Sequence, residues 1–127
     1  MKRESLFLIV AALGLTPIAL AYGAMPDTTL PLLYGVDVDN ISMRHILRAV
    51  MGLYLAMVVF WLMGAKREEL TIPALWSVAV FMLGLAAGRA ISLIVDGVPA
   101  PLLAIYLVLE IGFGFVSLYL IKNIKPA

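Results

Sequence analysis

The sequence predicts an all-α membrane protein in which four transmembrane helices form a compact bundle. Three observations lead to this fold class. First, 64% of the 127 residues are hydrophobic and 13% are charged, whereas an ordinary soluble domain is about 45–50% apolar and about 25% charged. Second, four stretches of roughly 20 mostly apolar residues are long enough to cross a bilayer. Third, the basic residues flank these stretches in a pattern that gives all four spans a consistent direction.

The same composition excludes several classes of function. A soluble chain of this size cannot hide so much apolar surface, because small domains leave a large share of their surface exposed. The net charge of +1 provides no strong field for nucleic acid, so we expect no nucleic-acid partner. Cysteine is absent and the sequence has one histidine, His45. A usual zinc site therefore lacks its nitrogen and sulfur ligands, and we expect neither a metal nor a cofactor.

The four predicted spans form a single domain over residues 1–127. They cover residues 6–24, 41–64, 72–95 and 101–121. The apolar run of the first span is long for a signal peptide, so we expect it to remain in the membrane. Asn40 or Ser42 is suited to cap the second helix, and Thr71 is suited to cap the third.

The connections between the spans are short, apart from one. Residues 66–69 join the second and third spans, and residues 96–100 form a tight turn with glycine and proline before the fourth. The longer connection, residues 25–40, contains the apolar segment Leu30–Tyr34, which is too short to span. We expect this segment to lie in the headgroup region or to fold over the helix ends as a lid.

The distribution of charge predicts the orientation of the bundle. One side carries six basic residues: Lys2, Arg3, Lys66, Arg67, Lys122 and Lys125. The other side carries one basic residue with four acidic ones: Arg44, Asp27, Asp37, Asp39 and Asp96. By the positive-inside rule, both termini lie in the cytoplasm and the longer connection faces outward.

Small residues predict close helix packing. Gly84 and Gly88 form a GxxxG step in the third span, and the fourth span offers Gly112 and Gly114. Small residues let two helix backbones approach closely in lipid. We favour packing within one bundle, and a seam between two copies of the chain is the alternative.

Three ionisable residues, Arg48, Arg89 and Glu110, lie inside apolar spans. At a rise of 1.5 Å per residue, the two arginines lie roughly 9 Å from the outer helix ends, and Glu110 lies roughly 14 Å deep. An arginine can extend its long side chain toward the interface, whereas a deep carboxylate needs a cation or a proton. We therefore predict that Glu110 pairs with Arg89, with Arg48 nearby.

Helical spacing adds further residues to this polar cluster. The predicted members are Arg44, Arg48, Arg89, Ser92, Asp96, Tyr106 and Glu110. Within each span their separations of three, four or seven residues place them on one helix face. If these faces converge, they form a pocket that opens outward beneath the longer connection. Tyr54 lies in mid-span, so its hydroxyl also needs a buried partner.

The cluster has two main interpretations. Polar groups in membrane bundles commonly connect helices, so the cluster is interpreted first as a structural ion-pair network. Charge inside a span also marks functional sites, which makes a pocket for a small amphipathic or anionic molecule the second interpretation. A proton or ion pathway is poorly supported, because the spans below Glu110 are apolar.

The leading function is a non-enzymatic integral membrane protein with a ligand pocket in the outer half of the membrane. The alternative is an accessory or assembly subunit, packed against a larger membrane complex or another copy of itself. An enzyme acting on lipids is a third class. It is poorly supported, because neither a nucleophile–base pair nor a metal set can be assembled from the sequence. Apart from these partners, we expect contact with membrane lipid.

Two segments resemble a known family. Residues 47–54, Leu-Arg-Ala-Val-Met-Gly-Leu-Tyr, are similar to the Arg-x-x-x-Gly-Leu-Tyr segment of the domain-of-unknown-function 4345 family. Residues 88–99 resemble its Gly-Arg-x-x-Ser-x-x-x-Asp-Gly-x-Pro segment, and Glu110 falls where the last helix of the family carries an acidic residue. The resemblance covers roughly residues 6–120. It implies a small four-helix protein of the bacterial inner (cytoplasmic) membrane and implies no activity.

Overall fold

The computed structural model of the protein describes residues 2–124, and five α-helices lie in this range. They are α1 (Arg3–Gly23), α2 (Pro26–Tyr34), α3 (Ile41–Lys66), α4 (Glu68–Val95) and α5 (Pro101–Asn123). By length and composition, α1, α3, α4 and α5 could each span a membrane. The chain is therefore all-α with four candidate spans, as predicted. The sequence did not predict the fifth helix, α2.

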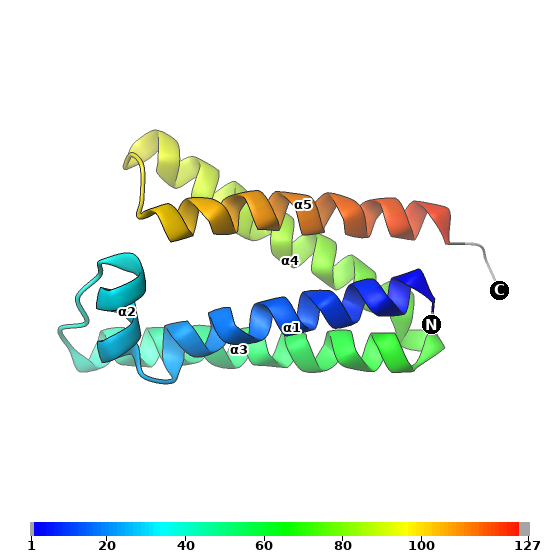
Figure 1. Ribbon diagram of the computed structural model, residues 1–127, viewed down its shortest axis with the longest axis horizontal. Helices are drawn as coiled ribbons and strands as arrows, with labels where there is room; N and C mark the ends of the chain where they lie inside the picture. Colours follow the sequence, from blue (N-terminus) through cyan, green and yellow to red (C-terminus); the bar gives the residue numbers. More distant parts are fainter. Residues whose placement is uncertain (1, 125–127) are drawn as a thin grey trace.

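The long helices form two antiparallel pairs (Figure 1). α1 lies along α3, and α5 lies along α4, which crosses from one pair to the other and also contacts α3. The beginning of α1 and the end of α5 lie at the same end of the molecule, and α2 lies at the opposite end. The two pairs separate toward the α2 end.

The apolar core holds the two pairs together where α1, α3, α4 and α5 meet. Leu8, Trp61 and Leu75 are fully buried there. The indole Nε1 of Trp61 donates a hydrogen bond to Ser77 Oγ (2.9 Å), and Ser117 Oγ donates to the carbonyl of Leu75 (2.6 Å). These polar side chains are satisfied by a neighbouring helix, which is how polar groups stabilise bundles in lipid.

Close helix contacts occur at glycines other than the predicted GxxxG step. A Cβ atom built on Gly23, Gly64 or Gly114 would come within 2.4, 2.3 and 2.6 Å of a neighbouring side chain. A Cβ atom on Gly84 or Gly88 would meet nothing within 4 Å among residues 2–124. The prediction that the GxxxG step packs closely within the bundle is therefore wrong, because the described residues leave a hollow at these glycines, bordered on α3 by Leu53 and Tyr54.

The helix ends follow from local capping. Asn40 caps α3, and its Oδ1 accepts a hydrogen bond from the Met43 amide (2.8 Å), as predicted. Arg67 alone separates α3 from α4. Thr71 consequently lies inside α4, where its hydroxyl donates to the carbonyl of Gly64 (2.7 Å). The prediction that Thr71 caps this helix is wrong, because α4 begins one turn earlier, at the two glutamates that favour a helix N-terminus.

The connection between α1 and α3 contains α2, which folds back onto the bundle. Leu30 and Tyr34 bury their side chains against α1, α3 and α5. Gly35 adopts a φ of 68°, and its amide donates to the carbonyl of Pro31 (3.2 Å), which ends the helix. Of the two arrangements expected for this apolar segment, the structure shows the lid over the helix ends.

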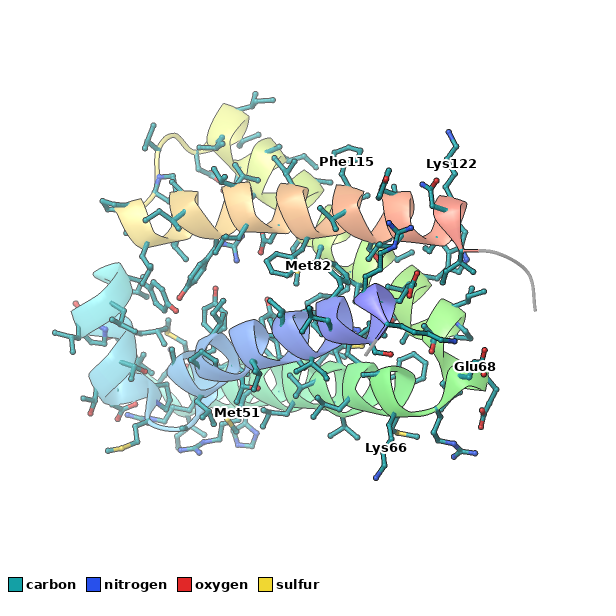
Figure 2. All side chains as sticks on the ribbon, turned by 45° about the vertical axis from the view of Figure 1, so that its right-hand side comes forward. Met51, Lys66, Glu68, Met82, Phe115 and Lys122 are labelled. Atoms are coloured by element: carbon teal, nitrogen blue, oxygen red, sulfur yellow. The ribbon has the colours of Figure 1, made fainter. Side chains whose placement is uncertain are left out.

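Apolar side chains also cover the outside of the bundle. Val80, Val108 and Phe115 are exposed, and Figure 2 shows Phe115 pointing away from the helices. An apolar surface of this extent is unfavourable in water and suits a hydrocarbon environment. Lys66 and Lys122 lie at the end of the bundle opposite α2. Lys125, counted with them in the sequence, lies outside the described residues.

Candidate functional site

The candidate site is built around an ion pair between α4 and α5. Arg89 Nε lies 2.9 Å from Glu110 Oε1 and 3.1 Å from Oε2. Their side chains are 23% and 8% exposed. The predicted pairing of these two residues is confirmed. Because either charge alone is costly away from water, the pair fixes the relative position of the two helices.

Two tyrosines complete the surroundings of Arg89. Its Nη2 donates to the hydroxyl of Tyr22 (3.3 Å), and its guanidinium carbon lies 5.8 Å from the centre of the Tyr106 ring. The latter distance is within the range of a cation–π contact. Tyr106 thus joins Arg89 and Glu110, as predicted. Arg89 Nη1 forms no hydrogen bond with residues 2–124, so its two N–H groups remain available.

The hydroxyl of Tyr106 connects the site to α2. It lies 2.8 Å from the hydroxyl of Tyr34, whose ring stacks on Tyr22 with centroids 5.5 Å apart. Burial, together with the hydrogen bond to Tyr106, raises the pKa of Tyr34 above its ordinary value. The Tyr34 phenol therefore stays protonated at neutral pH, and α2 remains hydrogen-bonded to α5.

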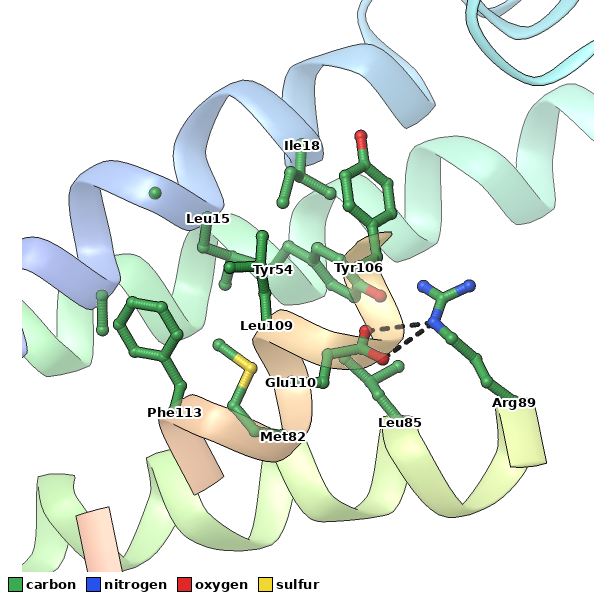
Figure 3. A pocket seen from close by; sticks show the side chains of 12 residues that line it. Leu15, Ile18, Tyr54, Met82, Leu85, Arg89, Tyr106, Leu109, Glu110 and Phe113 are labelled. Carbon is green, nitrogen blue, oxygen red and sulfur yellow. Dashed lines mark hydrogen bonds and ion pairs between the residues drawn. The ribbon is translucent and has the colours of Figure 1, made fainter. Parts of the chain in front are cut away.

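A cavity of about 60 Å³ lies beside the ion pair, between the two helix pairs (Figure 3). Its apolar lining residues are Ala11, Gly14, Leu15, Ile18, Met82, Leu85, Leu109 and Phe113. Its polar lining residues are Tyr54, Arg89, Tyr106 and Glu110. Figure 3 shows Arg89 and Tyr106 toward one end and Phe113 toward the other. One water molecule needs about 10–15 Å³ of such volume, so this space is large enough for a few water molecules or for a small apolar group.

Tyr54 differs from the expectation drawn from its mid-span position. Its ring is buried between Tyr22 and Phe81, with edge-to-face contacts at 5.7 and 5.1 Å. Its hydroxyl, however, forms no hydrogen bond with residues 2–124. The expected buried partner is therefore missing from the described part of the chain, and Tyr54 instead lines the cavity. A hydroxyl in this position can bond to a molecule inside the cavity.

Arg44 and Arg48 do not reach the ion pair. Arg44 binds Asp27 of α2, with Nε 2.9 Å from Oδ1 and Nη2 3.0 Å from Oδ2. This hydrogen bonding lowers the pKa of Asp27 below its usual range. Arg48 is exposed and lines a surface hollow with Arg44 and Asp27. The expectation that Arg48 lies near Glu110 is wrong, because its face of α3 is turned toward the beginning of α2.

Ser92 lies one turn beyond Arg89 on α4, and Asp96 directly follows the end of this helix. Ser92 Oγ donates to Asp96 Oδ2 (2.7 Å), and both residues are exposed. Neither forms a hydrogen bond to Arg89 or Glu110 in the described part of the chain. Ser92 and Arg89 nevertheless line a second cavity of about 120 Å³ between α4 and α5. The predicted cluster is thus divided into an inner ion pair and outer groups.

The acidic and histidine side chains do not gather into a metal centre. Within residues 2–124, no group of three or more such side chains could hold a metal ion. Among residues 2–124, Glu110 carries the buried carboxylate. Arg89 already binds both oxygens of this carboxylate. The chemistry that remains available is hydrogen bonding from Arg89 Nη1 and the Tyr54 hydroxyl.

Sequence reasoning missed Tyr22 and Tyr34 as parts of the site. Tyr22 lies near the end of α1, at a level that the extended side chain of Arg89 can reach. Tyr22 could have been identified by comparing the depth of each tyrosine hydroxyl in the membrane with the depths of the charged side chains. Tyr34 could not be placed in this way, because its position depends on α2 folding back over the bundle.

Comparisons with known proteins give one match. A family model described as "Domain of unknown function (DUF4345)" matches residues 4–121. The matched region contains α2, α3 and α4 completely and nearly all of α1 and α5, including every residue of the ion pair and cavity. No curated protein and no solved structure matches the chain.

Proposed function

The chain belongs to the DUF4345 family, and within that family we propose that it is a non-enzymatic, single-domain membrane protein that binds a small amphipathic molecule. The observation that carries this proposal is the cavity between the helix pairs, in which apolar walls adjoin Tyr54, Arg89, Tyr106 and Glu110. Ligand sites in proteins combine a mostly apolar lining with a few polar groups that orient the ligand.

The polar groups favour a head group that accepts hydrogen bonds. With respect to residues 2–124, Arg89 Nη1 is free to donate, and the Tyr54 hydroxyl is free to donate or accept. Because Glu110 already balances the charge of Arg89, a neutral head is less costly to bury here than a carboxylate. A long-chain alcohol therefore represents the proposed ligand class better than a fatty acid. The fatty acid, whose head group is anionic, is the comparison ligand.

Gly14 provides a means of testing the cavity. It is exposed, it lines the cavity, and a Cβ atom built on it meets nothing within 4 Å among the described residues. A leucine at this position would occupy the mouth of the cavity. Gly112 of α5 is a matched control, because it has the same free space and lies outside the lining of this cavity.

The experiment is photolabelling in lipid nanodiscs with a long-chain alcohol that carries a diazirine at the end of its chain. We expect labelling on the cavity-facing residues of α1 and α5, mapped by peptide mass spectrometry, with competition by excess unlabelled alcohol. Gly14→Leu is expected to abolish this labelling, and Gly112→Leu is expected to preserve it. Labelling spread evenly over the outer helix faces, or unchanged in Gly14→Leu, would contradict the proposal.

We further propose that the four long helices span the bacterial inner (cytoplasmic) membrane with both termini in the cytoplasm. Lys66 and Lys122 lie at the end of the bundle where α1 begins and α5 ends, which supports this orientation by the positive-inside rule. The chain lacks cysteine, so single cysteines at position 37 or 122 report topology cleanly. A membrane-impermeant maleimide added outside is expected to label Asp37→Cys and not Lys122→Cys. The reverse pattern would mean the opposite orientation.

The uncovered glycine face of α4 favours a second candidate function, an accessory subunit of a larger membrane complex or of a homo-oligomer. Gly84 and Gly88 leave space for another helix to approach. This alternative predicts that Gly84→Leu reduces crosslinking to a partner chain while leaving the photolabelling of the cavity unchanged.

A further inference from the structure

The surface hollow between α2 and α3 is distinct from the cavity described above. It has a volume of about 210 Å³ and is lined by the connection between α1 and α2, by the first turn of α2 and by two arginines of α3. Arg44 and Arg48 are one helical turn apart, so both side chains lie on the same face of α3. The hollow has no part in the proposed binding of an amphipathic molecule.

The charges around this hollow do not balance. Asp27 supplies one carboxylate, and Arg44 binds both of its oxygens. Arg48 lines the same hollow and forms no ion pair with residues 2–124. Two guanidinium groups therefore share one carboxylate. By contrast, Arg89 deeper in the bundle has a carboxylate of its own.

The depth of the hollow indicates which kind of anion the two arginines can reach. α3 ends at Lys66, and about 20 residues cross the hydrocarbon. Counting back from Lys66 places the hydrocarbon boundary near Ile46. Arg44 then lies at the level of the headgroups, and Arg48 lies within one turn of the boundary. Lipid phosphates occupy this level, and a planar guanidinium binds phosphate oxygens through paired hydrogen bonds.

We propose that Arg44 and Arg48 bind the phosphate of an anionic phospholipid in the leaflet at the α2 end of the bundle. Arg48 supplies the uncompensated charge, and Arg44 adds donors that Asp27 does not use. Met25 lines the hollow, and its exposed side chain can contact an apolar part of the lipid. The site does not depend on which end of the bundle faces the cytoplasm.

The test is a lipid titration followed by native mass spectrometry, with phosphatidylglycerol and phosphatidylcholine compared on the detergent-solubilised protein. Wild type is expected to bind phosphatidylglycerol more tightly. Arg48→Gln is expected to lower that affinity about five-fold, the effect of removing one cation near an anionic surface, and to leave phosphatidylcholine unaffected. Arg67→Gln is the matched control: it removes an exposed arginine at the other end of α3, and we expect no change.

Two further measurements distinguish lipid binding at this site from loss of structure and from binding of free phosphate. Asp27→Asn frees Arg44 and is expected to raise the affinity for phosphatidylglycerol, a gain that loss of structure would not produce. Inorganic phosphate is expected not to displace the lipid at comparable concentration, since it lacks acyl chains. The proposal is overturned if the two lipids bind equally, if Arg48→Gln changes neither affinity while circular dichroism shows an intact fold, or if inorganic phosphate competes as well as the lipid.

Discussion

Individual residues determine where charge is tolerated in this bundle. Arg89 and Glu110 neutralise one another across two helices, with the Tyr22 and Tyr106 side chains around the guanidinium. Arg44 neutralises Asp27 at the surface, and Arg48 is left without a carboxylate among the described residues. The same residue type therefore has three different environments, which follow from its depth and from the helix that faces it.

The Arg89–Glu110 pair is expected to couple the effects of mutations. Arg89→Gln and Glu110→Gln should each destabilise the bundle, because each leaves the partner charge unpaired in a region poor in water. The double variant should lose less than the sum, with a coupling of about 0.5–3 kcal/mol. Unfolding free energies of the three variants and wild type in bilayers measure this cycle. Additive effects would show that the two side chains do not interact.

The Arg44–Asp27 pair predicts a pH dependence for the docking of α2. Because Arg44 lowers the pKa of Asp27, the pair stabilises the fold above the usual aspartate pKa of about 3.9 and loses this effect as pH falls through the lower folded value. We expect faster amide exchange in α2 below this range, after correction for the intrinsic pH dependence of exchange. Asp27→Asn should remove this pH dependence of amide exchange in α2. If exchange in that variant changes with pH as much as in wild type, the pH dependence does not come from the Arg44–Asp27 pair.

At the scale of elements, the bundle is held together where helices touch through small residues. Gly23 brings α1 against α3, Gly64 brings α3 against α4, and Gly114 accommodates a leucine of α4. Gly84 and Gly88 form the GxxxG step noted in the sequence, yet no described residue lies within 4 Å of a Cβ atom built on either glycine, and both line a hollow beside α3. A motif shows that close packing is possible, and the three-dimensional arrangement decides which glycines are used.

Two glycine-to-alanine changes are expected to have different effects on the stability of the bundle. In Gly64→Ala the new Cβ would lie 2.3 Å from the Cβ of Ala74, so overpacking should cost about 1–3 kcal/mol. In Gly84→Ala the Cβ meets nothing within 4 Å among the described residues, and the higher helix propensity of alanine should leave stability equal or raise it by up to about 1 kcal/mol. Thermal unfolding in one detergent compares them, and equal losses would contradict the packing described here.

The sequence was sufficient for the elements that depend on hydrophobic length. The four long apolar helices and the cap at Asn40 could be predicted, because apolar runs and capping residues act locally. The predicted start of α4 lay about one turn too far along the chain. Thr71 is a good cap in isolation, but the two glutamates before it extend the helix toward its N-terminus. The helical conformation of α2 could not be predicted. Its nine residues contain an internal proline, Pro31, and they pack against helices that are distant in the sequence.

At the scale of the whole molecule, two helix pairs enclose a space that their side chains do not fill completely. The ion pair could be predicted from the depths of Arg89 and Glu110, since a deep carboxylate needs a cation. The position of Arg48 could not, because depth alone does not specify which face of α3 is turned toward the bundle. A pocket beside the polar cluster was predicted on the condition that the helix faces converge. Its apolar lining could not be predicted, since this depends on the angle at which α4 crosses between the pairs.

The most direct test of the central claim is the amount of amphipathic molecule retained per chain after purification from native membrane, measured by native mass spectrometry. Wild type and Gly112→Leu are expected to retain the same bound mass at close to one copy per chain, and Gly14→Leu is expected to lose it. Equal retention by all three proteins, or no retained molecule in wild type, would contradict the claim that the cavity beside Arg89 and Glu110 is a binding site.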